Sequence, residues 1–124
     1  MKRVILESPY RVNQTIKRGG ISGVSDVYEI KIIQAKYKIY ACKCVIDCLG
    51  RDESPFASHL IFTQMLDDNI SEHRQLGMEA GFTWYSVADY CVVYNNYGIS
   101  EGMQKGIIKA EQAGLRIHYR KIHV

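Results

Sequence analysis

The sequence predicts an α/β fold built on a mainly parallel, doubly wound sheet. Short, continuously apolar runs alternate along the chain with longer segments of helical periodicity, the order typical of strand–helix–strand units. The runs are apolar throughout, as expected of parallel strands covered on both faces. With 124 residues, 47% hydrophobic and 23% charged, the chain has the size and composition of a single domain spanning residues 1–124.

Four segments are predicted to be strands. Residues 3–7 form an apolar run that stops at Ser8-Pro9, and residues 90–94 form a second one that stops at Asn95. A very short strand is expected at residues 56–58, after Pro55, and residues 115–119 close the sheet. Ligands of such sheets bind beyond the carboxyl ends of the strands, so the loops after these runs are candidate sites.

Three segments are predicted to be helices, covering residues 26–50, 71–87 and 101–110. Ser25 or Asp26, Ser71 and Ser100 are the expected caps. Residues 59–64 have no clear pattern. Residues 11–25 are basic and glycine-rich, and we expect them to form a lid-like loop inserted into the domain.

Several classes of function are disfavoured. No apolar run approaches the roughly 18 residues of a membrane span, so we expect no membrane partner and a cytoplasmic location. The net charge of +3 is too small for a nucleic-acid surface. The spacing of the four cysteines fits neither a disulfide scaffold nor a zinc site, so we expect buried reduced thiols, no metal and no cofactor.

The first candidate binding cluster follows the first strand and comprises Ser8, Pro9, Tyr10 and Arg11. An aromatic ring suits stacking on a base or ribose, and a guanidinium suits phosphate. A plain proline-containing turn explains the same residues equally well.

The second cluster, Ser58 and His59, follows the predicted short strand. A histidine just past a strand end can contact a ligand. A half-buried histidine that only satisfies its own hydrogen bonds is the competing interpretation.

The third cluster is the polar loop after residues 90–94 and the helix start that follows it. Free N–H groups at such a start can bind anions or hydroxyls, although an ordinary capped helix has the same sequence. The candidate ligand-binding residues here are Asn95, Asn96, Gly98, Ser100, Gly102 and Met103.

Five short motifs, in this order, resemble a family of small proteins grouped with the nucleoside 2-deoxyribosyltransferases. The resemblance implies a flavodoxin-like, three-layer α/β/α fold, oligomers whose pockets are completed by neighbouring subunits, and substrates with an N-glycosidic bond. The motifs are Glu7-Ser8-Pro9-Tyr10, residues 55–59, residues 66–69, residues 77–81 and Gly98-Ile99-Ser100-x-Gly102-Met103.

The resemblance also implies where a catalytic carboxylate belongs. In the transferases, a glutamate attacks the anomeric carbon of the sugar. Gln104 aligns with that glutamate, and Asn96 aligns with a position that commonly carries aspartate. An amide keeps the shape but loses the charge. Glu101, one turn earlier, is a possible substitute for the nucleophile.

The leading hypothesis is therefore a protein that binds, sequesters or senses a nucleotide derivative, such as an ADP-ribose-like or cyclic-nucleotide molecule. The alternatives are an active N-glycosidase or deoxyribosyltransferase, and a protein-interaction module. We also expect a homo-oligomer with Trp84, or Tyr119 and Arg120, near the contact. A core position is an equal alternative for Trp84 and is favoured over stacking on a base.

Overall fold

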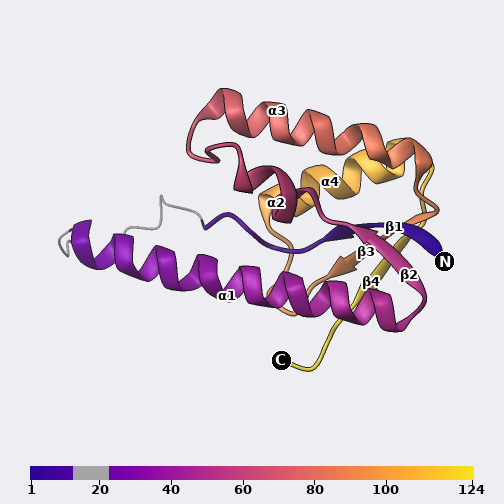
Figure 1. Ribbon diagram of the computed structural model, residues 1–124, viewed down its shortest axis with the longest axis horizontal. Coiled ribbons are helices and arrows are strands. Elements are labelled where there is room, and N and C mark those ends of the chain that lie inside the picture. Colours follow the sequence, from indigo (N-terminus) through magenta and orange to yellow (C-terminus); the bar gives the residue numbers. More distant parts are fainter. Residues whose placement is uncertain (13–22) are drawn as a thin grey trace.

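The computed structural model describes residues 1–12 and 23–124 of the chain (Figure 1). In these residues four strands form one sheet in the order β2-β1-β3-β4, and every neighbouring pair is parallel. The strands are β1 (Lys2–Glu7), β2 (Glu53–Phe56), β3 (Tyr90–Tyr94) and β4 (Ile117–Arg120). The predicted parallel α/β fold is confirmed.

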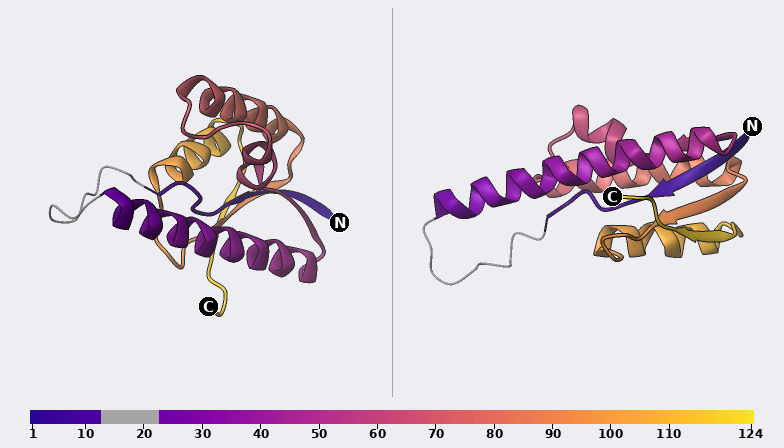
Figure 2. Two further views of the ribbon diagram at one scale, coloured as in Figure 1. Left: turned by 60° about the vertical axis from the view of Figure 1, so that its left-hand side comes forward. Right: turned by 90° about the horizontal axis from the view of Figure 1, so that it is seen from below.

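Helices lie on both faces of the sheet. The long α1 (Gly23–Gly50) runs along one face, while α3 (Ser71–Phe82) and α4 (Glu101–Gln112) lie on the other (Figures 1 and 2). The short α2 (Ser58–Ile61) and two 3₁₀ helices, η1 (Phe62–Gln64) and η2 (Thr83–Val87), complete the connections. The architecture is the three-layer, flavodoxin-like arrangement.

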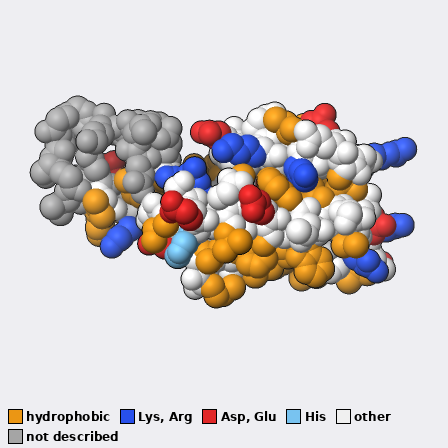
Figure 3. Space-filling model, turned by 90° about the horizontal axis from the view of Figure 1, so that it is seen from above, with side chains coloured by type: hydrophobic (Ala, Val, Ile, Leu, Met, Phe, Trp, Pro, Cys, Tyr) orange, Lys and Arg blue, Asp and Glu red, His pale blue; other side chains and the backbone are white. Residues whose placement is uncertain are grey.

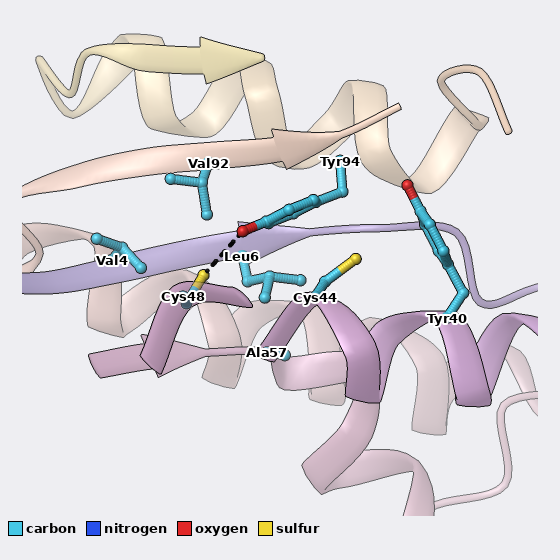
Figure 4. Close-up of a cluster of buried hydrophobic side chains, with 8 residues drawn as sticks. All are labelled: Val4, Leu6, Tyr40, Cys44, Cys48, Ala57, Val92 and Tyr94. Carbon is cyan, nitrogen blue, oxygen red and sulfur yellow. Dashed lines mark hydrogen bonds between the residues drawn. The ribbon is translucent and has the colours of Figure 1, made fainter. Parts of the chain in front are cut away.

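The core has two halves because successive strand residues point to opposite faces. Val4 and Leu6 of β1 and Val92 and Tyr94 of β3 face α1, where they pack against its buried side chains (Figure 4). The intervening strand residues face α4 and form a second cluster with side chains of η2 and α4. Its strand members are Ile5, Cys91 and Val93, and its helical members are Tyr85, Met103, Ile107 and Ala110. The two central strands, β1 and β3, are therefore covered on both faces, which explains their apolar runs.

A buried ion pair crosses the α1 side of the sheet. Both terminal nitrogens of Arg120 lie 2.7 Å from the carboxylate oxygens of Glu53, which is 2% exposed. Tyr90 also donates to Glu53, and Arg120 donates to the hydroxyl of Tyr94. These contacts hold the guanidinium of Arg120 largely inside the fold.

Several predicted boundaries needed correction. The last strand is residues 117–120 instead of 115–119, and the helix predicted over residues 71–87 ends at Phe82, where η2 follows. The second strand is residues 53–56 instead of 56–58, and it includes Pro55. Proline lacks a donor but is tolerated at a sheet edge, which is where β2 lies. Of the predicted lid at residues 11–25, residues 23–25 belong to α1, and residues 13–22 lie outside the described residues.

Two side chains, those of Cys42 and Trp84, differ from expectation in their burial. Cys42 is exposed, although all four cysteines are free and the other three are buried as predicted. Trp84 is 50% exposed and stacks on Phe56 with ring centroids 5.3 Å apart, so the alternative of a core position is wrong. In the described segments, no helix is both long and apolar enough to cross a membrane.

Candidate functional site

The carboxyl ends of β1, β2 and β3 meet at one edge of the parallel sheet. From β1 the chain passes to β2, which lies on one side of β1, and it then crosses to β3, which lies on the other side of β1. Such a change of direction opens a crevice beyond the strand ends, which is the usual ligand site of doubly wound sheets. All three predicted clusters begin at this edge, after Glu7, Phe56 and Tyr94.

Ser8 and His59 form a pair at this edge. The Ser8 hydroxyl is hydrogen-bonded to Nε2 of His59 at 2.7 Å, and Ser8 is almost fully buried. Burial lowers the pKa of His59 to about 4. The imidazole is therefore neutral near pH 7 and can accept the hydroxyl proton in its hydrogen bond. Two residues predicted separately thus form one polar unit.

The residues around this pair contribute a ring and a positive charge. The Tyr10 ring lies beside His59, with centroids 6.3 Å apart. Pro9 is buried and Arg11 is exposed. Burial raises the pKa of Asp68, and the positive charge of Arg11 opposes that shift, so Arg11 lies near the turn at Asp67 and Asp68. Tyr10 thus lies beside the Ser8–His59 pair, and Arg11 follows it in the chain.

Ser58 has a packing role. It is the first residue of α2, and a Cβ placed on Gly81 of α3 would lie only 2.9 Å from the Ser58 Cβ. The side chain therefore faces the contact between the two helices. This close approach fixes α2, and with it His59, against α3.

Glu7 was not among the predicted site residues. Its carboxylate accepts a hydrogen bond from the Tyr85 hydroxyl at 2.7 Å and packs against Gly106 of α4, where any Cβ would overlap it. Burial raises the pKa of Glu7 to about 7, against the lowering effect of Tyr85. A glutamate at the end of the run Val4-Ile5-Leu6, facing the same side as Ile5, was the signal available in the sequence.

The amide of Asn96 is occupied within the fold. Its oxygen accepts from the Tyr40 hydroxyl at 2.7 Å and from the Ile122 N–H at 2.9 Å, and its nitrogen donates to the Ile122 carbonyl at 2.8 Å. Only one N–H of the amide is left for a ligand. Because an aspartate cannot donate to Ile122, the C-terminal segment explains why an amide occupies this position.

Contacts within the fold also shape the rest of the loop after β3. Asn95 accepts from Lys121 through its side-chain oxygen at 3.1 Å, and Gly98 has the positive φ of +80° that favours glycine. Ser100 caps α4 as predicted, accepting from the N–H of Met103 at 3.3 Å.

The α4 residues divide into buried and exposed sets. Met103 is 2% exposed and belongs to the core, so its predicted contact with a ligand is wrong for the side chain. Gly102 faces open space. Gln104 and Glu101 are both exposed, and Glu101 is paired with Lys105 at 3.7 Å. Neither lies in the dry environment that would activate a catalytic group.

Metal ligation has no support in the described part of the chain, where no group of three or more His, Cys, Asp or Glu could hold an ion.

The chain has no significant match among curated proteins or solved structures. Residues 2–120 match the family described as a domain of unknown function (DUF7768). This match covers nearly the whole chain, and the chain therefore belongs to the DUF7768 family.

Proposed function

We propose that the carboxyl edge of the sheet binds a nucleoside or nucleotide derivative, such as an ADP-ribose-like molecule or a cyclic nucleotide, and sequesters or senses it. The observation that carries the proposal is the Ser8–His59 pair, a neutral polar unit beyond the carboxyl ends of β1 and β2. Hydroxyl and imidazole groups suit ribose hydroxyls, Tyr10 suits a base, and Arg11 suits a phosphate.

The resemblance to the nucleoside 2-deoxyribosyltransferases supports the same class of ligand. At the position of the attacking glutamate in that family, this chain has the uncharged and exposed Gln104. Glu101, the possible substitute, is exposed and shares its charge with Lys105. Both observations favour binding over the family's glycosyl transfer.

A ligand panel tests the proposal. Thermal shift and calorimetry with ADP-ribose, cyclic nucleotides and plain nucleosides should identify at least one ligand of the wild type. Ser8→Ala and Arg11→Ala should weaken its binding tenfold or more, as expected for lost hydrogen bonds to a charged or polar ligand. Arg51→Ala, which removes an exposed arginine from the opposite edge of the sheet, should leave binding unchanged.

One observation favours an enzymatic alternative, hydrolysis of an N-glycosidic bond. Glu7 is a carboxyl whose raised pKa keeps it partly protonated near neutral pH, as a general acid requires. It would protonate the departing base as the C1′–N bond breaks. Water would then add to the anomeric carbon and return a proton to the carboxylate, leaving a free base and a free sugar.

Base release measured by chromatography decides between the two functions. A binder releases no base from any nucleoside or nucleotide in the panel. A hydrolase does, and Glu7→Gln should then abolish release, while Glu101→Gln should not.

We further propose that the protein works in the cytoplasm as a homo-oligomer. Four free thiols are typical of a reducing compartment. Apolar side chains lie exposed around α2, α3 and η2, where Figure 3 shows a broad hydrophobic area. These are Ile61, Met65, Leu76, Trp84 and Val87. Sedimentation of the wild type and of Trp84→Lys tests this contact, since the variant should be a monomer.

A further inference from the structure

The outer face of α1 is apolar and lies outside the fold. Its inner face packs on the sheet through Tyr40, Ala41, Cys44 and Cys48, which are all buried. Figure 2 shows α1 lying along the outside of the molecule in the view from below, with no other described element across it. The outer face consists of Tyr28, Ile32, Ala35, Ile39, Cys42, Ile46 and Leu49, all exposed.

These seven residues, here called the α1 seam, are spaced alternately by four and three residues. That spacing is the heptad repeat of helices that pack along their length, with Ile32, Ile39 and Ile46 at one of the two seam positions of each heptad. Burial in the core of this chain does not explain it, because Ile46 is 67% exposed. A helix that is apolar on both faces is normally covered on both.

An apolar groove lies beside the α1 seam and extends the apolar surface. It has a volume of about 380 Å³ and is bounded by Ile32, Ala35 and Ile39 on α1 and by Tyr97 and Val124 opposite. Lys36 lies over the Tyr97 ring, 4.5 Å from its centroid. An elongated apolar partner laid on the seam would also fill this groove.

The charges along the seam select the partner. Lys31 and Lys38 flank one side, and Lys36 and Lys43 flank the other, with Glu29 the one acidic residue at the flanking positions of the described helix. In a parallel pair of two copies, Lys31 of one copy would lie beside Lys36 of the other, and Lys38 beside Lys43. Such like-charge contacts oppose self-association.

We propose that the α1 seam docks an amphipathic helix of another protein, with an apolar heptad face flanked by aspartate or glutamate. The apolar residues supply the contact area, and the four lysines select acidic flanks and reject basic ones. No residue of the α1 seam belongs to the proposed site at Ser8 and His59, so the inference is independent of the proposed ligand.

Two synthetic peptides of four heptads test the proposal. They share isoleucine and leucine at the seam positions, and one carries glutamate at the flanking positions while the other carries lysine. Cys42 provides a local readout, because it is the exposed cysteine within the seam, and the other three thiols are buried. Binding to the intact protein should slow alkylation of Cys42.

The glutamate peptide should bind and reduce the alkylation rate at least tenfold, and the lysine peptide should not. Reversing two charges with Lys36→Glu and Lys43→Glu together should move the preference toward the lysine peptide by tenfold or more. Ile39→Glu should abolish binding, whereas Ile108→Glu, at an exposed position on α4, should not.

Three results would overturn the proposal. The first is an unchanged alkylation rate with the glutamate peptide. The second is equal binding of both peptides. The third is protection of Cys42 that rises with protein concentration in the absence of peptide, which would show that a second copy covers the seam. Circular dichroism of each variant confirms that the fold is retained.

Discussion

The Ser8 hydroxyl and Nε2 of His59 lie 2.7 Å apart, although 51 residues separate them in the chain. The parallel pairing of β1 with β2 brings them together, because each residue follows the carboxyl end of its strand. Burial keeps the imidazole neutral. This relationship is the basis of the proposed site, and it also makes the stability of the fold depend on pH.

His59 should destabilise the fold as the solution becomes acidic. Its pKa is about 4 in the folded protein, against 6.5 as the ordinary value, so the unfolded chain binds more protons between these values. Stability due to His59 is present above pH 6.5 and is lost as the pH falls toward 4, by about 1.4 kcal/mol per pH unit within that window. Urea unfolding of His59→Asn should lack this contribution, and His123→Asn, at an exposed position, should retain it.

The contribution of Glu7 to the stability of the fold should change with pH in the opposite direction. Its folded pKa of about 7 lies above its ordinary value of 4.5, so stability due to Glu7 is present below pH 4.5 and is lost as the pH rises through 7. Between about pH 4.5 and 6.5 the two residues therefore offset each other in the wild type. His59→Asn should become less stable as the pH rises through this range, and Glu7→Gln should become more stable. Parallel pH profiles for the two variants would refute this assignment.

Gly106→Ala should destabilise the protein by about 1–3 kcal/mol, because the added methyl overlaps the Glu7 carboxylate beneath α4. Gly102 lies on the same helix with open space around it, and Gly102→Ala should be neutral or stabilising by up to about 1 kcal/mol. Denaturant midpoints of the two variants provide the comparison. Combining Gly106→Ala with Glu7→Ala should recover part of the loss.

Asn96→Asp should cost about 1–3 kcal/mol, because the carboxylate cannot donate to the Ile122 carbonyl and would lie against it. Asn95→Asp is the matched control, since its side-chain oxygen already accepts from Lys121 and a negative charge suits that contact. If Asn96→Asp were as stable as the wild type, the C-terminal segment would not explain the amide at this position.

The sequence was most informative where periodicity and caps act locally. The apolar run at β3 matches the observed strand residue for residue, and Ser100 caps α4 as expected. The boundaries of β2 were misjudged because the strand was expected to begin only after Pro55, whereas an edge strand can include a proline that lacks the N–H donor. The helical spacing of the apolar residues in α1 predicted a buried inner face. The second apolar face was not recognised, because it consists of the same kinds of residue.

Much of the candidate site depends on contacts between distant residues. Glu7 and Tyr85 are 78 residues apart, and nothing near Glu7 in the sequence indicates that a glycine of α4 covers its carboxylate. Similarly, Asn96 and Met103 belong to a polar, glycine-bearing segment that is typical of a binding loop. Only the tertiary packing shows that the Asn96 side chain is hydrogen-bonded to Ile122 and that the Met103 side chain is buried in the core.

The most direct test of the proposed site is an NMR titration that follows the histidine ring resonances while ADP-ribose, a cyclic nucleotide or a nucleoside is added. We predict that the His59 resonances shift in a saturable way with at least one of these ligands, while those of the exposed His123 do not. If a ligand binds and leaves His59 unchanged, or if no ligand in the series binds, the carboxyl edge between β1 and β2 is not a nucleotide site.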